Sequence, residues 1–136
     1  MGNKEKHLEF IQGIINRMAS NSFALKGWAV TLVAGIFALA SRDSEKLFFL
    51  VAYIPILIFW GLDAYYLSQE RRYRDLYNKV RFMDDNNVDY SLDVSAKEFK
   101  TEKNKWFFCV RSRTIIWFYA PLALLTTGII VLTTLF

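Results

Sequence analysis

Three long apolar stretches, separated by polar segments, dominate the order of residues along this chain. The first covers residues 22–40, the second residues 47–66 and the third residues 114–135. Each stretch is close to the roughly 20 residues that a helix needs to cross about 30 Å of hydrocarbon. Because a backbone in hydrocarbon must satisfy its own hydrogen bonds, the pattern predicts three transmembrane helices.

The N-terminal segment, residues 1–21, has the pattern of an amphipathic helix on the cytoplasmic side. Leu8, Ile11, Ile15 and Met18 recur at helical spacing, with polar residues between them. One interpretation is a helix that lies on the membrane surface before the first span. The other is a lid or collar that packs on neighbouring subunits. The cap-type residues at 20–22 predict a break or bend before the first span.

Residues 67–113 join the second and third spans and predict a helical hairpin. Helical composition continues from the second span to Met83 without Gly or Pro, and residues 84–87 favour a turn. Ser95 and Glu98 then match a capping box, from which a second helix is expected to continue into the third span, residues 114–136. The predicted fold class is an all-α integral membrane protein. Its parts are the N-terminal amphipathic helix, two transmembrane helices within residues 22–66, a cytoplasmic hairpin that extends the second and third spans, and the third transmembrane helix.

Composition supports a membrane protein and argues against an enzyme. Apolar residues make up 54% and aromatic residues 17% of the 136 residues, whereas charged residues make up only 22%. Cys109 and His7 are the single cysteine and the single histidine, so the chain lacks the residues for an intrachain disulfide or a zinc site of the usual kind. We therefore expect no catalytic residues, no metal and no cofactor.

The placement of Lys and Arg predicts how the chain crosses the membrane. The connection between the first two spans holds only Arg42 and Lys46, whereas the connection between the second and third holds eleven basic residues. The positive-inside rule places the N-terminus and the hairpin in the cytoplasm and leaves the C-terminus on the far side.

The net charge of +4 conceals a separation of charge along the hairpin, whose tip, residues 84–93, is acidic. Basic residues toward the membrane attract anionic lipid and fix topology, which is one complete explanation of them. Their alternation with aromatic residues favours a second one, a site for a nucleotide or single-stranded oligonucleotide, because bases stack on aromatic rings while cations bind phosphates. The candidate ligand-binding residues are Arg71, Arg72, Arg74, Tyr77, Lys79, Arg81, Lys103, Lys105, Trp106, Arg111 and Arg113. Tyr77 fits the hairpin core equally well.

Residues inside the spans give candidates for a pore or a gate. Asp63 lies four residues from the expected cytoplasmic end of the second span, and an acid at that depth is a functional candidate. A simpler interpretation pairs it with Lys26 of the first span. Ala120, Thr127 and Thr134 give the third span a small, weakly polar face, suited to helix packing or to a pore wall.

Oligomerisation is expected on simple geometric grounds. Three spans are too few to enclose a channel, so a conducting pore needs several subunits. Ala34 and Ala38 offer a face on the first span that allows close helix packing. We therefore expect a homo-oligomer surrounded by membrane lipid.

The run NSFALKGWAVTLVAGIFALASR at residues 21–42, which follows the amphipathic helix, resembles the start of small membrane effectors of bacterial anti-phage nucleotide-signalling systems. These families include CBASS-type transmembrane effectors and the Hailong membrane effector. The resemblance covers the N-terminal helix and the first span, and continues beyond them only as a similar layout. It implies a bacterial inner-membrane location with a periplasmic C-terminus. It also implies an oligomer that is switched by a nucleotide or oligonucleotide, and a partner nucleotidyltransferase that supplies this ligand. The resemblance further implies that the oligomer permeabilises the inner membrane.

Two other functions fit the same pattern. A membrane scaffold would dock a protein partner on the hairpin, with the acidic tip as the contact. A small transporter would use Asp63 as its ion-coupling acid, and that residue is its only support.

Overall fold

The computed structural model describes residues 3–41, 46–88, 90–94, 97–99, 101 and 104–135. Every regular element within these ranges is helical, as the sequence predicts. In chain order the elements are α1 (Asn3–Ala40), the 3-10 helix η1 (Lys46–Ala52), α2 (Tyr53–Arg81), the 3-10 turns η2 (Asp85–Asn87) and η3 (Lys97–Phe99), α3 (Trp106–Val110) and α4 (Arg113–Leu135).

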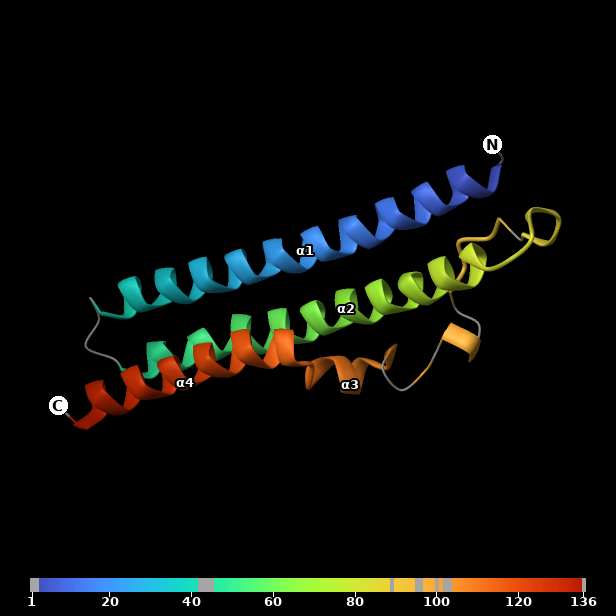
Figure 1. Cartoon of the computed structure of the whole chain (residues 1–136). Helices are drawn as coiled ribbons and strands as arrows, with labels where there is room; N and C mark the ends of the chain where they lie inside the picture. The colour runs from blue at the N-terminus through green and yellow to red at the C-terminus, as the bar shows by residue number, and fades with distance from the viewer. Residues whose placement is uncertain are drawn as a thin grey trace.

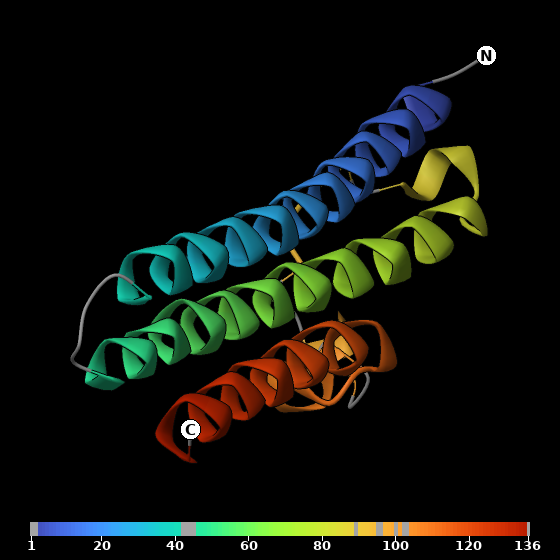
Figure 2. The ribbon, with the colours of Figure 1, turned by 90° about the vertical axis from the view of Figure 1, so that its left-hand side faces the viewer.

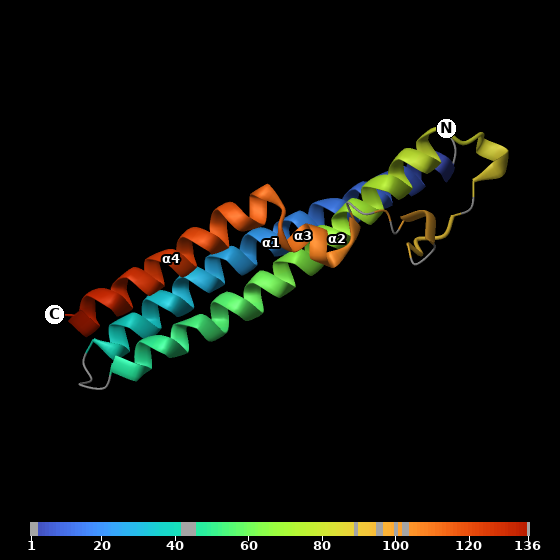
Figure 3. The same ribbon diagram turned by 90° about the horizontal axis from the view of Figure 1, so that it is seen from below.

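The three long helices lie side by side and form an elongated bundle (Figures 1 and 2). α1 and α2 run antiparallel along most of their length, and α4 lies against the first half of α2 (Figure 3). The N-terminus lies beside the end of α2, whereas the C-terminus lies at the opposite end of the bundle. We call the half that contains α4 the apolar half and the half that contains the N-terminus the polar half.

α1, the segment from Phe48 to Arg81 and α4 are each long and apolar enough to cross a membrane. Only 17%, 28% and 17% of the residues in their most apolar windows are buried within one chain. Most of the apolar surface in these windows is therefore not buried by other parts of the same chain. In a membrane, lipid and further subunits can contact such a surface.

α1 is continuous from Asn3 to Ala40, so the break predicted at residues 20–22 is wrong. Cap-type residues favour helix ends because their side chains compete for backbone hydrogen bonds. The Ser22 hydroxyl is instead engaged by side chains, since it donates to Asp63 and accepts a hydrogen bond from Lys26. The amphipathic segment and the first span are therefore one helix.

The apolar face of the N-terminal segment packs against the same chain. Ile11 and Ile15 are buried against Leu76 and Val80 of α2, and Phe99 completes the cluster. α1 therefore carries the segment in one continuous helix along α2. The partner of α2 in the polar half is α1 rather than a second arm of the hairpin.

The predicted helix from Ser95 into the third span is wrong. The described residues after α2 form short turns, the five-residue α3 and a separate start of α4 at Arg113. Asn104 explains part of the interruption, because its buried amide donates to the Phe99 carbonyl oxygen at 2.8 Å and to the Asp75 carboxylate at 2.6 Å. A side chain that binds backbone groups in this way competes with helix formation. Ser95, the cap residue of the predicted box, lies outside the described residues, and Glu98 pairs with Lys79 instead.

Small residues allow close packing in the apolar half. Ala29 of α1 and Ala64 of α2 are fully buried beside Ile115 and Tyr119 of α4, and Cys109 of α3 joins this cluster. The cluster fixes α3 against the middle of the bundle, where the two halves meet.

Candidate functional site

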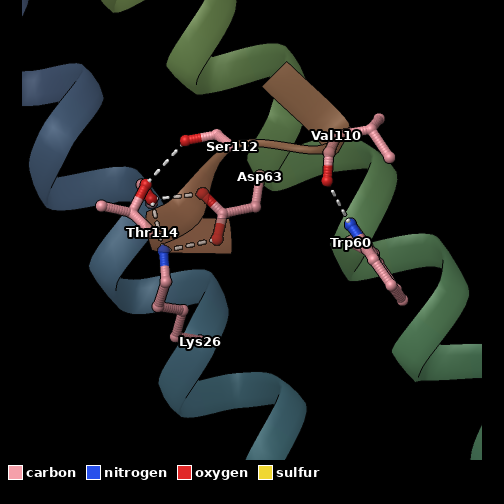
Figure 4. Close-up of polar contacts among 7 residues, drawn as sticks. Lys26, Trp60, Asp63, Val110, Ser112 and Thr114 are labelled. Atoms are coloured by element: carbon pink, nitrogen blue, oxygen red, sulfur yellow. Dashed lines mark hydrogen bonds and ion pairs between the residues drawn. The ribbon is translucent and has the colours of Figure 1, made fainter. Parts of the chain in front are cut away.

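A charged pair, which we call the buried pair, lies largely buried where α1 and α2 face each other in the apolar half. The Asp63 side chain is inaccessible to solvent and the Lys26 side chain is 21% exposed, with its ammonium 2.5 Å from Oδ2 of Asp63. The Ser22 hydroxyl donates to the other carboxylate oxygen, and Lys26 also donates to Ser22 at 2.9 Å. Figure 4 shows the Lys26 and Asp63 side chains pointing toward each other from the two helices. The predicted pairing of Asp63 with Lys26 is confirmed.

Close to this pair, aromatic side chains pack α2 against α4, the third span. Tyr119 of α4 is fully buried and stacks on Trp60 of α2, with ring centroids 5.8 Å apart. The Trp60 indole donates to the Val110 carbonyl oxygen at 3.1 Å, as Figure 4 shows. Three long helices and α3 are therefore held together within one turn of the buried carboxylate.

A basic hollow of about 470 Å³ lies in the polar half, between α2 and the segment leading into α3. Its lining consists of Arg71, Arg74, Asp75, Asn78, Asn104 and Phe108. The Arg71 guanidinium lies over the Phe108 ring, 5.7 Å from its centroid, and donates to the Ser112 hydroxyl at 3.4 Å. The Arg71 and Arg74 guanidinium groups, the Asp75 carboxylate, the Asn78 amide and the Phe108 ring thus face one hollow, and Arg74 also pairs with Glu70 at 3.1 Å. The two cations and the aromatic ring are the groups that suit a planar ligand with a phosphate.

Other predicted ligand-binding residues of α2 lie outside this hollow. Lys79 pairs with Glu98 at 2.6 Å, and Arg81 lies over the Phe82 ring, 4.8 Å from its centroid. Arg72 is half-buried. Tyr77 packs against the apolar cluster of the polar half, so its ring serves as core.

The predicted residues around α3 form a second group. Trp106 donates its indole N–H to the Gly61 carbonyl oxygen at 2.9 Å. Lys105 and Arg111 line a smaller hollow of about 230 Å³ together with Phe107 and Phe108. Arg113 is exposed at the start of α4, and Lys103 lies outside the described residues.

Cys109 lies behind the basic hollow and accepts a long hydrogen bond from Arg71 at 3.7 Å. Burial raises the pKa of the Cys109 thiol, and the nearby positive charges of Arg71 and Arg72 offset part of that rise. A buried thiol with a raised pKa is a poor nucleophile. Among the described residues no cluster of His, Cys, Asp and Glu has the geometry of a metal site.

The predicted face of α4 is turned away from the centre of the bundle along much of its length. Thr127 and Thr134 are exposed and donate to the Ala123 and Ile130 carbonyl oxygens of their own helix. Thr127 also shares a 2.5 Å hydrogen bond with the Tyr53 hydroxyl of α2, and Ala120 is half-buried. The structure therefore does not bring this face together with Asp63 in one chain.

Sequence reasoning missed most of one exposed face of α1, which we call the α1 seam. Its residues alternate at spacings of four and three and are small with one exception: Gly13, Arg17, Ser20, Ala24, Gly27, Thr31, Ala34 and Ala38, all of them exposed. This is the a/d spacing of a heptad, and small residues on it let helix backbones approach closely. Of this seam only Ala34 and Ala38, with Gly35 beside them, were predicted to pack.

Comparison with protein-family models, with curated proteins and with solved structures found no match. Functional inference therefore depends on the geometry of the buried pair, the basic hollow and the exposed helix faces.

Proposed function

We propose that this protein is a non-enzymatic, oligomeric membrane effector of bacterial anti-phage defence that works as a ligand-gated pore. The observation that carries the proposal is the continuity of α2 between the basic hollow and the buried ion pair. Arg71 and Asp63 lie on one uninterrupted helix, about 12 Å apart along its axis. A ligand that changes the position of Arg71 would therefore move the helix that holds the buried pair.

The proposed ligand is a nucleotide or a single-stranded oligonucleotide. Arg71 and Arg74 supply cations for phosphate, and the Phe108 ring offers a surface for stacking. Asn78 adds an exposed amide group that can read a polar edge of a base. A partner nucleotidyltransferase is the proposed source of this ligand.

The proposed pore requires self-association. The apolar windows of the three long helices are mostly uncovered within one chain, and the α1 seam offers a surface for close contact with a second copy. Several copies around an axis would also gather their basic hollows into one positively charged ring. The proposed orientation places the polar half in the cytoplasm and the C-terminus in the periplasm, because the basic residues are concentrated beside the polar half.

Binding of a fluorescently labelled single-stranded oligonucleotide to the purified protein in detergent tests the ligand assignment. We expect the double substitution Arg71→Gln with Arg74→Gln to weaken binding about tenfold or more and to reduce its salt dependence, since two phosphate contacts are lost. The control double variant Lys6→Gln with Arg81→Gln removes the same charge from exposed positions outside the hollow. Equal binding by both double variants would contradict a site in the hollow.

A further inference from the structure

α3 turns three aromatic side chains outward although it has only five residues. Phe107 is 74% exposed, Phe108 48% and Trp106 42%, while Cys109 is fully buried. Each large apolar side chain left in water forgoes about 1.5–3 kcal/mol of burial free energy. Three neighbouring aromatic side chains on one short helix therefore indicate a surface that is covered in the working protein.

The contacts of α3 place it beside the end of the second apolar stretch. Trp106 donates to the Gly61 carbonyl oxygen, and a Cβ added at Gly61 would lie 3.6 Å from the Trp106 ring. Trp60 donates to Val110, and Cys109 packs in the same cluster as Ala64. Residues 60–64 of α2 belong to the apolar stretch 47–66, so α3 lies at the level where that stretch meets its polar continuation.

Cations surround these aromatic side chains. Lys105 precedes α3, Arg111 follows it and Arg113 begins α4, and all three are exposed. Lys105 and Arg111 line one hollow with Phe107 and Phe108, and no acidic residue is among its described lining. Aromatic rings at headgroup depth with cations reaching toward phosphates are the arrangement of an interfacial anchor.

We infer that α3 is an anchor that binds anionic phospholipid in the membrane leaflet next to the polar half. The Phe107 and Trp106 rings enter the boundary between headgroups and acyl chains, and Lys105 and Arg111 bind lipid phosphates. The inference does not depend on the proposed pore. It assigns Lys105, Trp106 and Arg111 to lipid, and it leaves the hollow at Arg71 and Arg74 to the soluble ligand.

Spin labelling tests the depth of α3 directly. A label at Phe107→Cys, in a Cys109→Ala background, is compared with a label at Phe82→Cys in the same background, in vesicles that contain phosphatidylglycerol. Phe82 is a matched control because it is 77% exposed and follows α2 in the polar half. We expect the label at 107 to collide mainly with dissolved oxygen and the label at 82 mainly with a water-soluble nickel complex. Equal access of the nickel complex to both positions would overturn the inference.

Measuring how much lipid stays bound tests what the charges of Lys105 and Arg111 contribute to lipid binding. This experiment leaves Cys109 unchanged. Bound phosphatidylglycerol is measured by native mass spectrometry for the double variant Lys105→Gln with Arg111→Gln. Each cation near a membrane surface contributes about 1 kcal/mol, so we expect phosphatidylglycerol affinity to fall on the order of thirtyfold. The control variant Lys6→Gln with Arg81→Gln loses the same charge in the polar half, distant from α3, and should retain the lipid.

A third arm separates lipid from nucleic acid. In phosphatidylcholine vesicles, a single-stranded oligonucleotide is added to the protein labelled at position 107. We expect no change in the label's access to the nickel complex. Protection by the oligonucleotide, combined with unchanged lipid retention in the Lys105→Gln, Arg111→Gln variant, would assign this surface to nucleic acid and overturn the lipid anchor.

Discussion

At the scale of single residues, the buried pair of Lys26 and Asp63 is the most demanding feature of the molecule. Removing two charges from water costs several kcal/mol for each ion, and their mutual attraction repays this only with good hydrogen-bonding geometry. Asp63 has that geometry, since Lys26 and Ser22 each bind one of its carboxylate oxygens. The pairing could be predicted because both residues stand out in apolar stretches at similar depth. The role of Ser22 could not, because it depends on the register of α1 against α2.

Breaking the pair on one side should be far more harmful than removing both charges. We expect Asp63→Asn to reduce the free energy of unfolding by up to about 3 kcal/mol, because the Lys26 charge is left without a counter-ion in a largely buried position. The double variant Asp63→Leu with Lys26→Met should recover most of that loss. Equilibrium unfolding in mixed detergent micelles measures both variants, and a double variant no more stable than Asp63→Asn would contradict a coupled pair.

At the scale of elements, long apolar periods were predictable and irregular segments were not. The three spans follow directly from composition, and the helix predicted to continue beyond the second span is present as α2, with Leu76 and Val80 on its buried face. The partner of that face was assigned to the wrong segment, because a helical pattern shows which face is buried but not what covers it. The interruption before α3 could not be predicted either, since it depends on the contacts of Asn104 with Asp75 and Phe99 across the fold.

The continuity of α1 gives a prediction at this scale. Proline in the interior of a helix costs about 3 kcal/mol or more, whereas proline at a helix start is tolerated. We therefore expect Ser20→Pro to reduce the thermal stability of the detergent-solubilised protein strongly. Ser20→Ala serves as the control and should be neutral or slightly stabilising. Equal melting temperatures for the two variants would show that the helix breaks at this position.

At the scale of the whole molecule, most of the apolar surface of the three long helices is left uncovered within one chain. The α1 seam is the face best suited to meet another copy, because its small residues permit close backbone approach. A Cβ atom added at Gly27 would have no other atom of its chain within 4 Å, apart from the neighbouring backbone of α1. A larger side chain there projects from the exposed face of α1, where the proposed second copy lies.

We expect Gly27→Leu to shift the detergent-solubilised protein from oligomer to monomer while its helical circular dichroism stays unchanged. Gly128→Leu in α4 is the matched control, since Gly128 also has open space around it within the chain. Mass measurement by light scattering after size-exclusion chromatography distinguishes the species. Loss of the oligomer in Gly128→Leu alone would place the interface on α4 instead.

A pore controlled by an anionic ligand is tested most directly by ion flux through vesicles that contain the purified protein. Potassium efflux is measured with and without a single-stranded oligonucleotide, for the wild type and for the Arg71→Gln, Arg74→Gln variant. We expect the oligonucleotide to change the efflux rate of the wild type and to leave the efflux rate of the variant unchanged. Wild-type vesicles whose efflux equals that of protein-free vesicles, with and without the oligonucleotide, would contradict a ligand-controlled pore.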